Sequence, residues 1–264
     1  MQSTRPHSVL LGVAKAAALE AGEFLASRFG VTSEGSFKSS HDIGLAEDKL
    51  SEEIILRHIR RQCPSHSIYS EEAGHLDSQS EYCWYVDPLD GTNNFFAKLP
   101  YFSVSIGLLR RDEIVLGVVY NPISRQFFHA VKGGGAYLDE QRLSPSRVST
   151  LSQAVCAFER GYVGEASDNS APQVLEAVQK NVRRCLVMWS PALDWCLLAC
   201  GGIDALVSID SSLEDQVAGT LIAQEAGCIV RSVRNEPYVF PERRIVASNS
   251  ELHSQMHALI PAGL

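Results

Sequence analysis

The stretch that decides the fold is Trp84-Tyr85-Val86-Asp87-Pro88-Leu89-Asp90-Gly91-Thr92-Asn93-Asn94-Phe95, residues 84–95. Its first residues are apolar and typical of a β-strand, which we expect to end at Asp87 because Pro88 offers no backbone donor. Gly91 permits a tight turn, and Thr92 and the two asparagines are suited to capping a following helix. The pattern therefore predicts a strand, a turn and a helix N-terminus in quick succession.

Two carboxylates, Asp87 and Asp90, project where this strand ends. The N–H groups at the start of the helix favour an anion such as phosphate, but two bare carboxylates beside a phosphate would repel it. A bound divalent cation resolves the conflict, because aspartate oxygens and the Leu89 carbonyl are hard ligands suited to Mg²⁺. An ordinary capped turn is the alternative, and it would need only one aspartate.

Two further acidic pairs stand at the ends of predicted elements. Glu71 and Glu72 follow a short β-type run, and Glu214 and Asp215 open a predicted helix. A Glu-Glu pair on a loop is usually solvated, and acidic residues in a first helical turn are commonly explained by the helix dipole. Neither pair alone therefore predicts a site.

The chain as a whole divides into two patterns. Residues 1–145 predict two helices followed by an antiparallel sheet, and residues 146–264 alternate strands with helices, which is typical of a layered α/β architecture. We therefore expect an α+β sub-domain and an α/β sub-domain that meet near residue 145. The predicted helices cover 8–29, 46–63, 171–183, 191–199, 214–226 and 252–260, and the predicted strands cover 67–70, 82–86, 102–109, 114–120, 126–131, 136–138, 155–158, 185–189, 203–209, 228–233 and 245–247.

Composition limits the class of partner. The 264 residues include 23 Lys and Arg against 31 Asp and Glu, a net charge of −8, which argues against binding to nucleic acid or to an anionic membrane. Seven cysteines without CxxC spacing indicate free thiols in a reducing compartment. No apolar run approaches the roughly 18 residues of a membrane span, so we expect a soluble, cytoplasmic protein.

Three other patterns predict no site. The glycines at 133–135 precede neither a Gly-Lys-Ser/Thr motif nor a helix, so a nucleotide-binding loop is not expected. His253 and His257 are four residues apart on the last predicted helix, but without a nearby Glu we expect them to be surface residues. Cys196 and Cys200 have the same spacing, and we expect them to pack in the core.

Together the acidic motifs resemble those of the inositol monophosphatase family of Mg²⁺-dependent, lithium-sensitive phosphatases. The resemblance runs from Lys38 to about Asn249 and rests on Ser-Glu-Glu at 70–72, on Asp-Pro-Leu-Asp-Gly-Thr-Asn-Asn-Phe at 87–95, and on Asp-x-x-Ala-Gly followed by Glu-Ala-Gly within 215–227. It implies the layered αβαβα sandwich of inositol and sugar phosphatases, a homodimer, and two or three Mg²⁺ ions in each site. The implied metal ligands are Glu71, Asp87, the Leu89 carbonyl, Asp90 and Asp215, and the implied phosphate-binding residues are Asp90, Gly91 and Thr92.

The same resemblance implies a catalytic mechanism and a role for Lys38 in a loop at the metal site. Asp48 would partner the Thr92 hydroxyl, and this pair and Glu71 would be the catalytic residues that orient the attacking water and take its proton. One Mg²⁺ would activate the water, and a second would stabilise the leaving oxygen. Lys38 matches the basic residue of a mobile loop at the metal site.

The expected substrate pocket departs from the family pattern. The turn that meets the substrate in the inositol enzymes is here Trp189-Ser190-Pro191-Ala192, and Ser208 stands where those enzymes carry a Glu that binds inositol hydroxyls. Glu214 stands where a Trp is usual. We therefore predict a phosphomonoesterase acting on a small polyol, sugar or cyclitol phosphate similar to inositol 1-phosphate, with histidinol phosphate, fructose 1,6-bisphosphate and aminocyclitol phosphates as alternatives. A non-catalytic regulatory or binding protein on the same fold is the alternative of another class.

Overall fold

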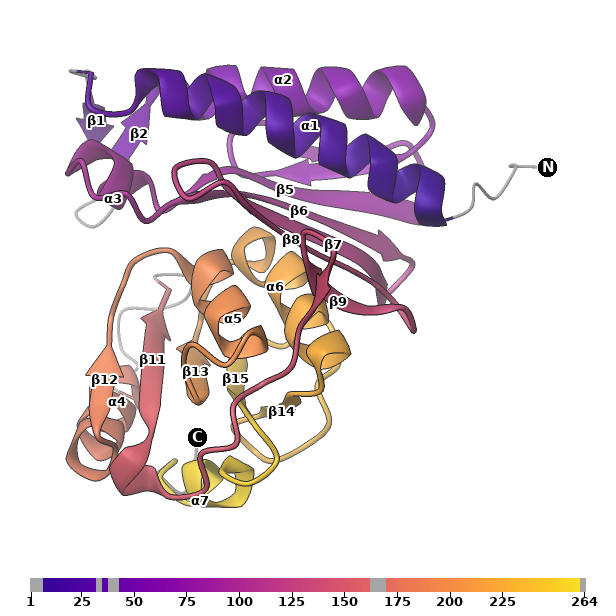
Figure 1. Cartoon of the computed structure of the whole chain (residues 1–264). Helices are drawn as coiled ribbons and strands as arrows, with labels where there is room; N and C mark the ends of the chain where they lie inside the picture. The colour runs from indigo at the N-terminus through magenta and orange to yellow at the C-terminus, as the bar shows by residue number, and fades with distance from the viewer. Residues whose placement is uncertain (1–6, 32–34, 38–42, 162–169, 262–264) are drawn as a thin grey trace.

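The computed structural model describes residues 7–31, 35–37, 43–161 and 170–261, which form two large sheets alternating with three layers of helices, and a small antiparallel sheet of β1 and β2 (Figure 1). The predicted αβαβα sandwich is therefore confirmed. The helices are α1 (His7–Arg28), α2 (Ala46–Gln62), α3 (Thr92–Phe96), α4 (Ser170–Asn181), α5 (Pro191–Ala199), α6 (Leu213–Ala226) and α7 (His253–His257), with a 3₁₀ turn at Leu151–Gln153. The strands are β1 (Gly35–Phe37), β2 (Ile43–Leu45), β3 (Ser67–Ser70), β4 (Gly74–Leu76), β5 (Tyr82–Asp90), β6 (Ser103–Arg110), β7 (Glu113–Asn121), β8 (Gln126–Val131), β9 (Gly135–Leu138), β10 (Gln141–Arg142), β11 (Val155–Arg160), β12 (Arg184–Leu186), β13 (Ala205–Ile209), β14 (Ile229–Ser232) and β15 (Arg244–Ser248).

The first sheet has the strand order β10-β9-β8-β7-β6-β5-β3-β4. Its strands pair antiparallel except β3 and β5, which are parallel, so the predicted antiparallel sheet needs that one correction. Helices α1 and α2 cover one face, where Leu10 and Ile55 share a core with Trp84 and Ile106. Helices α5 and α6 cover the other face.

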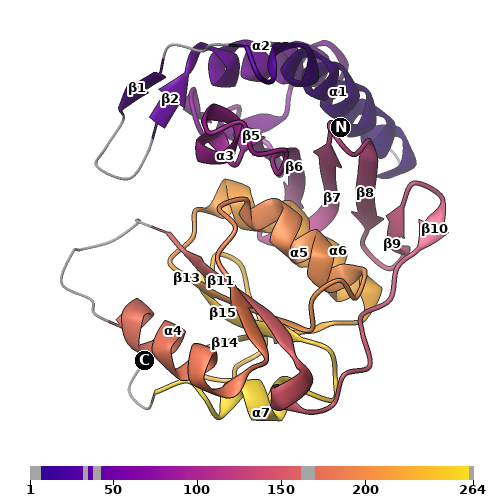
Figure 2. The same ribbon diagram turned by 60° about the vertical axis from the view of Figure 1, so that its left-hand side comes forward.

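The second sheet has the strand order β12-β11-β13-β15-β14. Strand β11 pairs in parallel with β12 and β13, whereas β15 pairs antiparallel with β13 and β14. Trp195 of α5 packs with Leu206 on one face, and Val174 of α4 and Met256 of α7 pack with Val207 on the other. Both sheets therefore share the middle layer of α5 and α6 (Figure 2).

Helix α6 lies against the first sheet at backbone contact distance. A Cβ atom at Gly117 of β7 would lie 2.5 Å from the carbonyl oxygen of Ala218, and one at Gly107 of β6 would lie 2.3 Å from Cγ1 of Val217. Such distances are too short for any side chain, so only glycine permits this approach. The contact places the first turn of α6, which includes Asp215, beside the sheet that carries Asp87.

The structure corrects further expectations. Strand β5 does not end at Asp87 but continues through Pro88 to Asp90, with its register against β6 shifted between the two aspartates. Strands β1, β2, β4 and β10 have two or three residues, which is too short for a hydrophobic period to reveal. His253 is buried rather than on the surface, because α7 packs on β15, and its Nδ1 lies 3.2 Å from the Ser248 hydroxyl.

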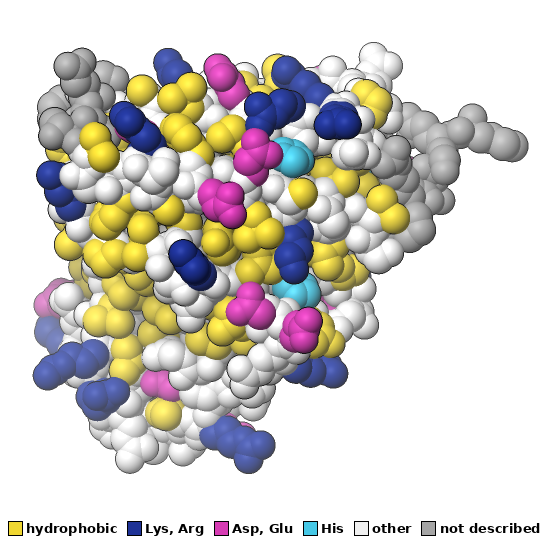
Figure 3. All heavy atoms as spheres, turned by 45° about the horizontal axis from the view of Figure 1, so that its top comes forward, with side chains coloured by type: hydrophobic (Ala, Val, Ile, Leu, Met, Phe, Trp, Pro, Cys, Tyr) yellow, Lys and Arg dark blue, Asp and Glu magenta, His cyan; other side chains and the backbone are white. Residues whose placement is uncertain are grey.

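The remaining sequence-based features concern thiols and surface charge. Cys196 is buried as expected, whereas Cys200 is exposed at the end of α5, and all seven thiols are free. Among the described residues, no helix combines the length and the apolar character needed to cross a membrane. Figure 3 shows one face on which basic side chains are interspersed with acidic ones rather than gathered into a stripe.

Candidate active site

The irregular end of β5 holds two carboxylates on a constrained backbone. Oδ1 of Asp87 accepts a hydrogen bond from the Leu89 N–H at 3.0 Å. The Ser51 hydroxyl of α2 donates to the Pro88 carbonyl at 2.7 Å. Because Pro88 offers no N–H, regular pairing cannot continue here, and the register shift beside Asp90 is the result.

Three carboxylates from two distant segments meet at this point. One oxygen each of Asp87, Asp90 and Asp215 lies within 4.8 Å of the other two. Asp87 and Asp90 are buried at the end of β5, and the half-buried Asp215 belongs to the first turn of α6. The structure thus brings three of the four predicted carboxylate ligands into one cluster.

The carboxylates of this cluster raise one another's pKa values. Burial, followed by the charges of Glu71 and Asp215, raises the pKa of Asp87 well above its ordinary value. Burial raises the pKa of Asp90 to about 6, and burial followed by the charge of Asp90 raises the pKa of Asp215 to about 7. A divalent cation would relieve this repulsion, and carboxylate oxygens are the ligands that Mg²⁺ prefers. The donor set therefore fits Mg²⁺.

Glu71, the fourth predicted carboxylate, lies beside the cluster. Its charge raises the pKa of Asp87, Asp90 and Asp215 alike, so the side chain is close enough to act on all three. Its backbone N–H donates to the Val86 carbonyl at 3.2 Å, which ties the residue to β5. Glu71 is thus held at the edge of the same acidic centre.

Glu52 of α2 holds the turn that follows Glu71. Its Oε1 accepts hydrogen bonds from the Glu72 and Ala73 N–H groups at 3.2 and 3.0 Å, and also one from the Ser70 hydroxyl. No sequence motif predicts a role for this residue. The available signal is its position four residues after Asp48, which places two buried acids on one helix face.

The predicted contact between Asp48 and Thr92 is present. The Thr92 hydroxyl lies 3.2 Å from Oδ1 of Asp48 and 2.9 Å from the Leu89 carbonyl. Asp48 is fully buried, and its Oδ2 accepts a hydrogen bond from the Leu45 N–H at 2.5 Å. Asp48 is therefore held in place between the start of α2 and the start of α3.

Gly91 makes the turn from β5 into α3 possible. Its φ angle of 90° lies in the left-handed region, and a Cβ there would lie 3.1 Å from the Tyr101 carbonyl oxygen and 3.2 Å from that of Trp189. The first N–H groups of a helix have no carbonyl partner within the helix. Backbone donors of Gly91 and Thr92 are thus placed next to the acidic cluster.

Ser190 and Ala192, which the sequence places in the substrate turn, contact Asp90. The Ser190 hydroxyl donates to Oδ2 of Asp90 at 2.5 Å, and the Ala192 N–H donates to Oδ1 at 3.3 Å. The Ser103 hydroxyl of β6 donates to the same Oδ2 at 2.7 Å and is a positioning residue that no sequence motif predicts. Trp189 differs from this buried pair, because its side chain is 61% exposed.

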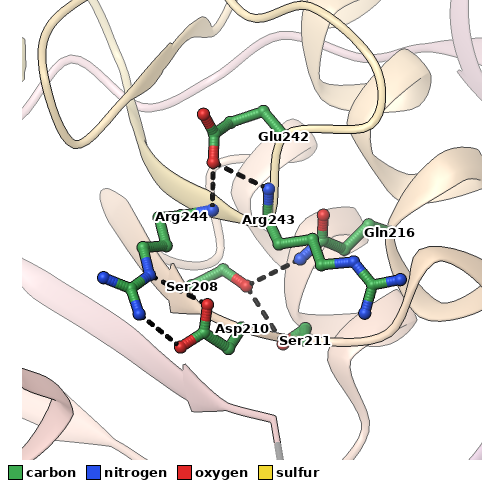
Figure 4. A network of polar contacts seen from close by, with 7 residues as sticks. All are labelled: Ser208, Asp210, Ser211, Gln216, Glu242, Arg243 and Arg244. Carbon is green, nitrogen blue, oxygen red and sulfur yellow. Dashed lines mark hydrogen bonds and ion pairs between the residues drawn. The ribbon is translucent and has the colours of Figure 1, made fainter. Parts of the chain in front are cut away.

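Ser208, the other predicted substrate residue, is fully buried. Its hydroxyl donates to Oγ of Ser211 at 3.0 Å and accepts from Nε2 of Gln216 at 3.1 Å (Figure 4). In the same network, Asp210 accepts two hydrogen bonds from Arg244, at 2.9 and 3.0 Å. The substrate contact of Ser208 stays a prediction, and Lys38 lies outside the described residues.

Comparison with known proteins agrees with the motifs. Residues 7–262 match the inositol monophosphatase family. The inositol-1-monophosphatase of Synechocystis is 34% identical over 257 residues, which cover 96% of this chain and 88% of that protein. The Nus factor SuhB of Escherichia coli K12 is 33% identical over 255 residues, which cover 94% of each.

A solved structure supports the same relationship. The inositol monophosphatase from Anabaena (Nostoc) superposes with a TM-score of 0.84 at 32% identity, covering 96% of this chain and 97% of that one. Fold and sequence thus agree over nearly the whole length. The chain therefore belongs to the inositol monophosphatase family of Mg²⁺-dependent phosphoric monoester hydrolases.

Proposed function

We propose that this protein hydrolyses the phosphate monoester of a small polyol, sugar or cyclitol with the help of Mg²⁺. The observation that carries the proposal is the cluster of Asp87, Asp90 and Asp215, whose oxygens lie within 4.8 Å of one another. Such a cluster, with Glu71 beside it, is costly to hold together without a cation. This favours a metal-dependent activity over a binding role that needs no metal.

The metal ligands would be Glu71, Asp87, the Leu89 carbonyl, Asp90 and Asp215, holding two or three Mg²⁺ ions. When bound, Mg²⁺ supplies positive charge to the phosphoryl oxygens and lowers the pKa of water. The Leu89 carbonyl accepts one hydrogen bond from Thr92 and has a second lone pair for a metal ion. The three hydrogen bonds to Asp90 set the orientation of its carboxylate in advance.

The chain's own groups would position the water and the phosphate. We assign acceptance of the water proton to Glu71 and to the Asp48–Thr92 pair, since Thr92 Oγ1 lies 3.2 Å from Oδ1 of Asp48. The N–H groups of Gly91 and Thr92 would donate to the phosphate. The water oxygen bonds to phosphorus, the P–O ester bond breaks, and the leaving oxygen takes up a proton. The products are an alcohol and inorganic phosphate.

The pocket favours a substrate other than inositol 1-phosphate. Ser208 supplies no carboxylate, and its hydroxyl is engaged by Ser211 and Gln216. The exposed indole of Trp189 would add a flat apolar wall. Histidinol phosphate, fructose 1,6-bisphosphate and aminocyclitol phosphates are the alternatives within this class.

A regulatory role is the second candidate, favoured by the 33% identity to a protein named as a Nus factor. Phosphate release from a panel of phosphomonoesters, with Mg²⁺ and with EDTA, separates the two. We expect release that depends on Mg²⁺. No release from any ester would favour the regulatory role.

Asp90→Asn tests the metal assignment, because the change keeps the shape of the side chain and removes one ligand charge. We expect kcat below about a tenth of the parent value, a barrier increase of more than ~1.4 kcal/mol, with an unchanged circular dichroism spectrum. Asp112→Asn, on the exposed turn between β6 and β7, is the matched control and should keep full activity. A kcat of Asp90→Asn above about a tenth of the parent value would contradict the assignment of Asp90 as a metal ligand.

A further inference from the structure

Glu159 is a buried acid on β11 that the mechanism above does not use. Its side chain is 4% exposed, and among the described residues neither carboxylate oxygen accepts a hydrogen bond. Alternation along the strand places it on the same face as Ala157, which packs against the α5–α6 layer, whereas Phe158 packs on the opposite face with Val174 of α4. Glu159 therefore points toward the middle helical layer, from which Asp215 also projects.

The neighbours of Glu159 belong to the active site. In the parallel pairing of β11 with β13, Glu159 lies opposite Ser208, whose hydroxyl donates to Ser211 instead. Burial raises the pKa of Glu159 well above its ordinary value, followed by the charge of Asp194, with further contributions from Asp215 and Asp90 and an opposing effect of the Ser208 hydroxyl. The charges of two members of the metal cluster thus act on the Glu159 carboxylate, which faces the helical layer that carries Asp215.

Asp194 of α5, the charge that raises the pKa of Glu159 most, already accepts a hydrogen bond within the protein. The Tyr101 hydroxyl donates to its Oδ1 at 2.6 Å, and the backbone N–H of Asp194 donates to the Ser190 carbonyl at 3.1 Å. Neither oxygen of Glu159 accepts a comparable hydrogen bond among the described residues, because the Ser208 hydroxyl, which opposes the rise in the pKa of Glu159, donates to Ser211. A buried polar group without a partner is destabilising, and native structures keep few of them outside sites that receive a ligand.

We infer that Glu159 is a specificity-determining residue that accepts a hydrogen bond from a donor, a hydroxyl or an ammonium group, on the leaving group of the phosphate ester. The inference rests on the proposed phosphatase function. Because Glu159 lies opposite Ser208 on the neighbouring strand, it would give the substrate site a carboxylate that position 208 lacks. The substrate class is then a phosphate ester whose leaving group bears a donor near the ester oxygen.

The activity test compares three esters in the parent and in Glu159→Leu. Phenyl phosphate has no such donor, glycerol 2-phosphate has hydroxyls, and O-phosphoethanolamine has an ammonium group. We expect kcat/KM in Glu159→Leu to fall roughly tenfold or more for at least one donor-bearing ester, the usual effect of losing a hydrogen bond to a charged group, and to stay within about twofold for phenyl phosphate. Glu159→Gln distinguishes a hydroxyl donor from an ammonium donor on the substrate. The amide oxygen of Gln still accepts a hydrogen bond from a hydroxyl, but it lacks the charge that attracts an ammonium group.

Two outcomes would overturn the inference while leaving the phosphatase function in place. One is an equal loss for all three esters, and the other is no loss for any of them in a folded Glu159→Leu variant. Failure of the parent to release phosphate from every ester with Mg²⁺ would instead refute both.

Thermal stability distinguishes a substrate-binding role of Glu159 from a structural role, because the two roles predict opposite changes in the Tm of Glu159→Leu. Removing an unpartnered buried carboxylate should raise the Tm of Glu159→Leu in EDTA by about 2–4 °C. Asp204 is the matched control, because it is equally buried beside β11 but accepts a hydrogen bond from the Val155 N–H at 2.7 Å. Asp204→Leu should lower the Tm. A comparable fall in Glu159→Leu would assign Glu159 to structure rather than to substrate.

Discussion

Gly117→Ala tests whether the backbone contact between α6 and the first sheet sets the metal site. The new Cβ would lie 2.5 Å from the Ala218 carbonyl oxygen and 2.9 Å from Cα of Ala218, and ordinary contact begins at 3.4 Å. The difference, 3.4 − 2.5 Å, means that α6 must move by about 0.9 Å. Because both opposing atoms belong to the helix backbone, no side-chain rotation can relieve the overlap. The first turn of α6 includes Asp215, so the shift reaches the acidic cluster.

Overpacking of this kind costs roughly 1–3 kcal/mol. At about 2–4 °C per kcal/mol for a chain of this size, the Tm should fall by about 2–12 °C. Displacement of a catalytic group by about 1 Å can lower kcat about 100-fold, and the Mg²⁺ concentration for half-maximal activity should rise.

Gly12→Ala is the matched control, because Gly12 lies within α1 with no atom within 4 Å of a new Cβ. It should raise the Tm by about 2–4 °C, since alanine favours a helix by ~1 kcal/mol over glycine. Calorimetry and a Mg²⁺ titration of phosphate release measure these effects. A Gly117→Ala protein with the parent's Tm and the parent's Mg²⁺ dependence would refute the reasoning.

Three other predictions concern charge and proton transfer. In EDTA, the pKa values of about 6 for Asp90 and about 7 for Asp215 exceed the ordinary 3.8, so both groups favour folding at low pH and lose this contribution as the pH rises toward 7. The gain in Tm on adding Mg²⁺ should therefore be larger at pH 8 than at pH 5, and a gain independent of pH would contradict this. Thr92→Val keeps the side-chain shape but removes the hydroxyl 3.2 Å from Asp48, so kcat should fall about 100-fold; steady-state kinetics showing a change in KM alone would assign Thr92 to binding only. Ser208→Glu would place a second carboxylate opposite Glu159 and should lower the Tm, and Glu159→Gln in the same chain should restore it, whereas an unchanged Tm in the single variant would contradict the strand register.

The alternation of strands and helices and the Asp87–Asp90 part of the metal cluster could be predicted because local patterns carry them, whereas Asp215 and Glu71 could be predicted only through the resemblance to a known family. The apolar run before Asp87 predicts a strand, and Asp87 and Asp90 together are one aspartate more than an ordinary capped turn needs, which favours a metal ion. The continuation of β5 through Pro88 could not be predicted, because proline usually ends a strand unless a register shift accommodates it.

The residues that hold the active-site carboxylates and turns in place could not be predicted from local sequence patterns. Ser190 bonds to Asp90 across 100 residues of sequence, and Glu52 bonds to the backbone of a turn 20 residues away. Neither contact has a local pattern, since each depends on how the layers stack. Glu159 could not be predicted either, because it stands beside Arg160 just after the apolar run 155–158, and only the pairing of β11 with β13 shows that it lies opposite Ser208.

The shared middle layer has a consequence for synthesis on the ribosome. Leu109, Val119 and Phe128 lie on the face of the first sheet that α5 and α6 cover. Strand β10 ends at Arg142 and α6 ends at Ala226, so 226 − 142 = 84 residues must still be made before that face can be covered. At about 5–20 residues per second, the nascent sheet keeps an apolar face exposed for about 4–17 s. Helices α1 and α2 can cover the opposite face much earlier, which leaves the nascent chain half-protected and makes this interval the period in which a chaperone would bind it.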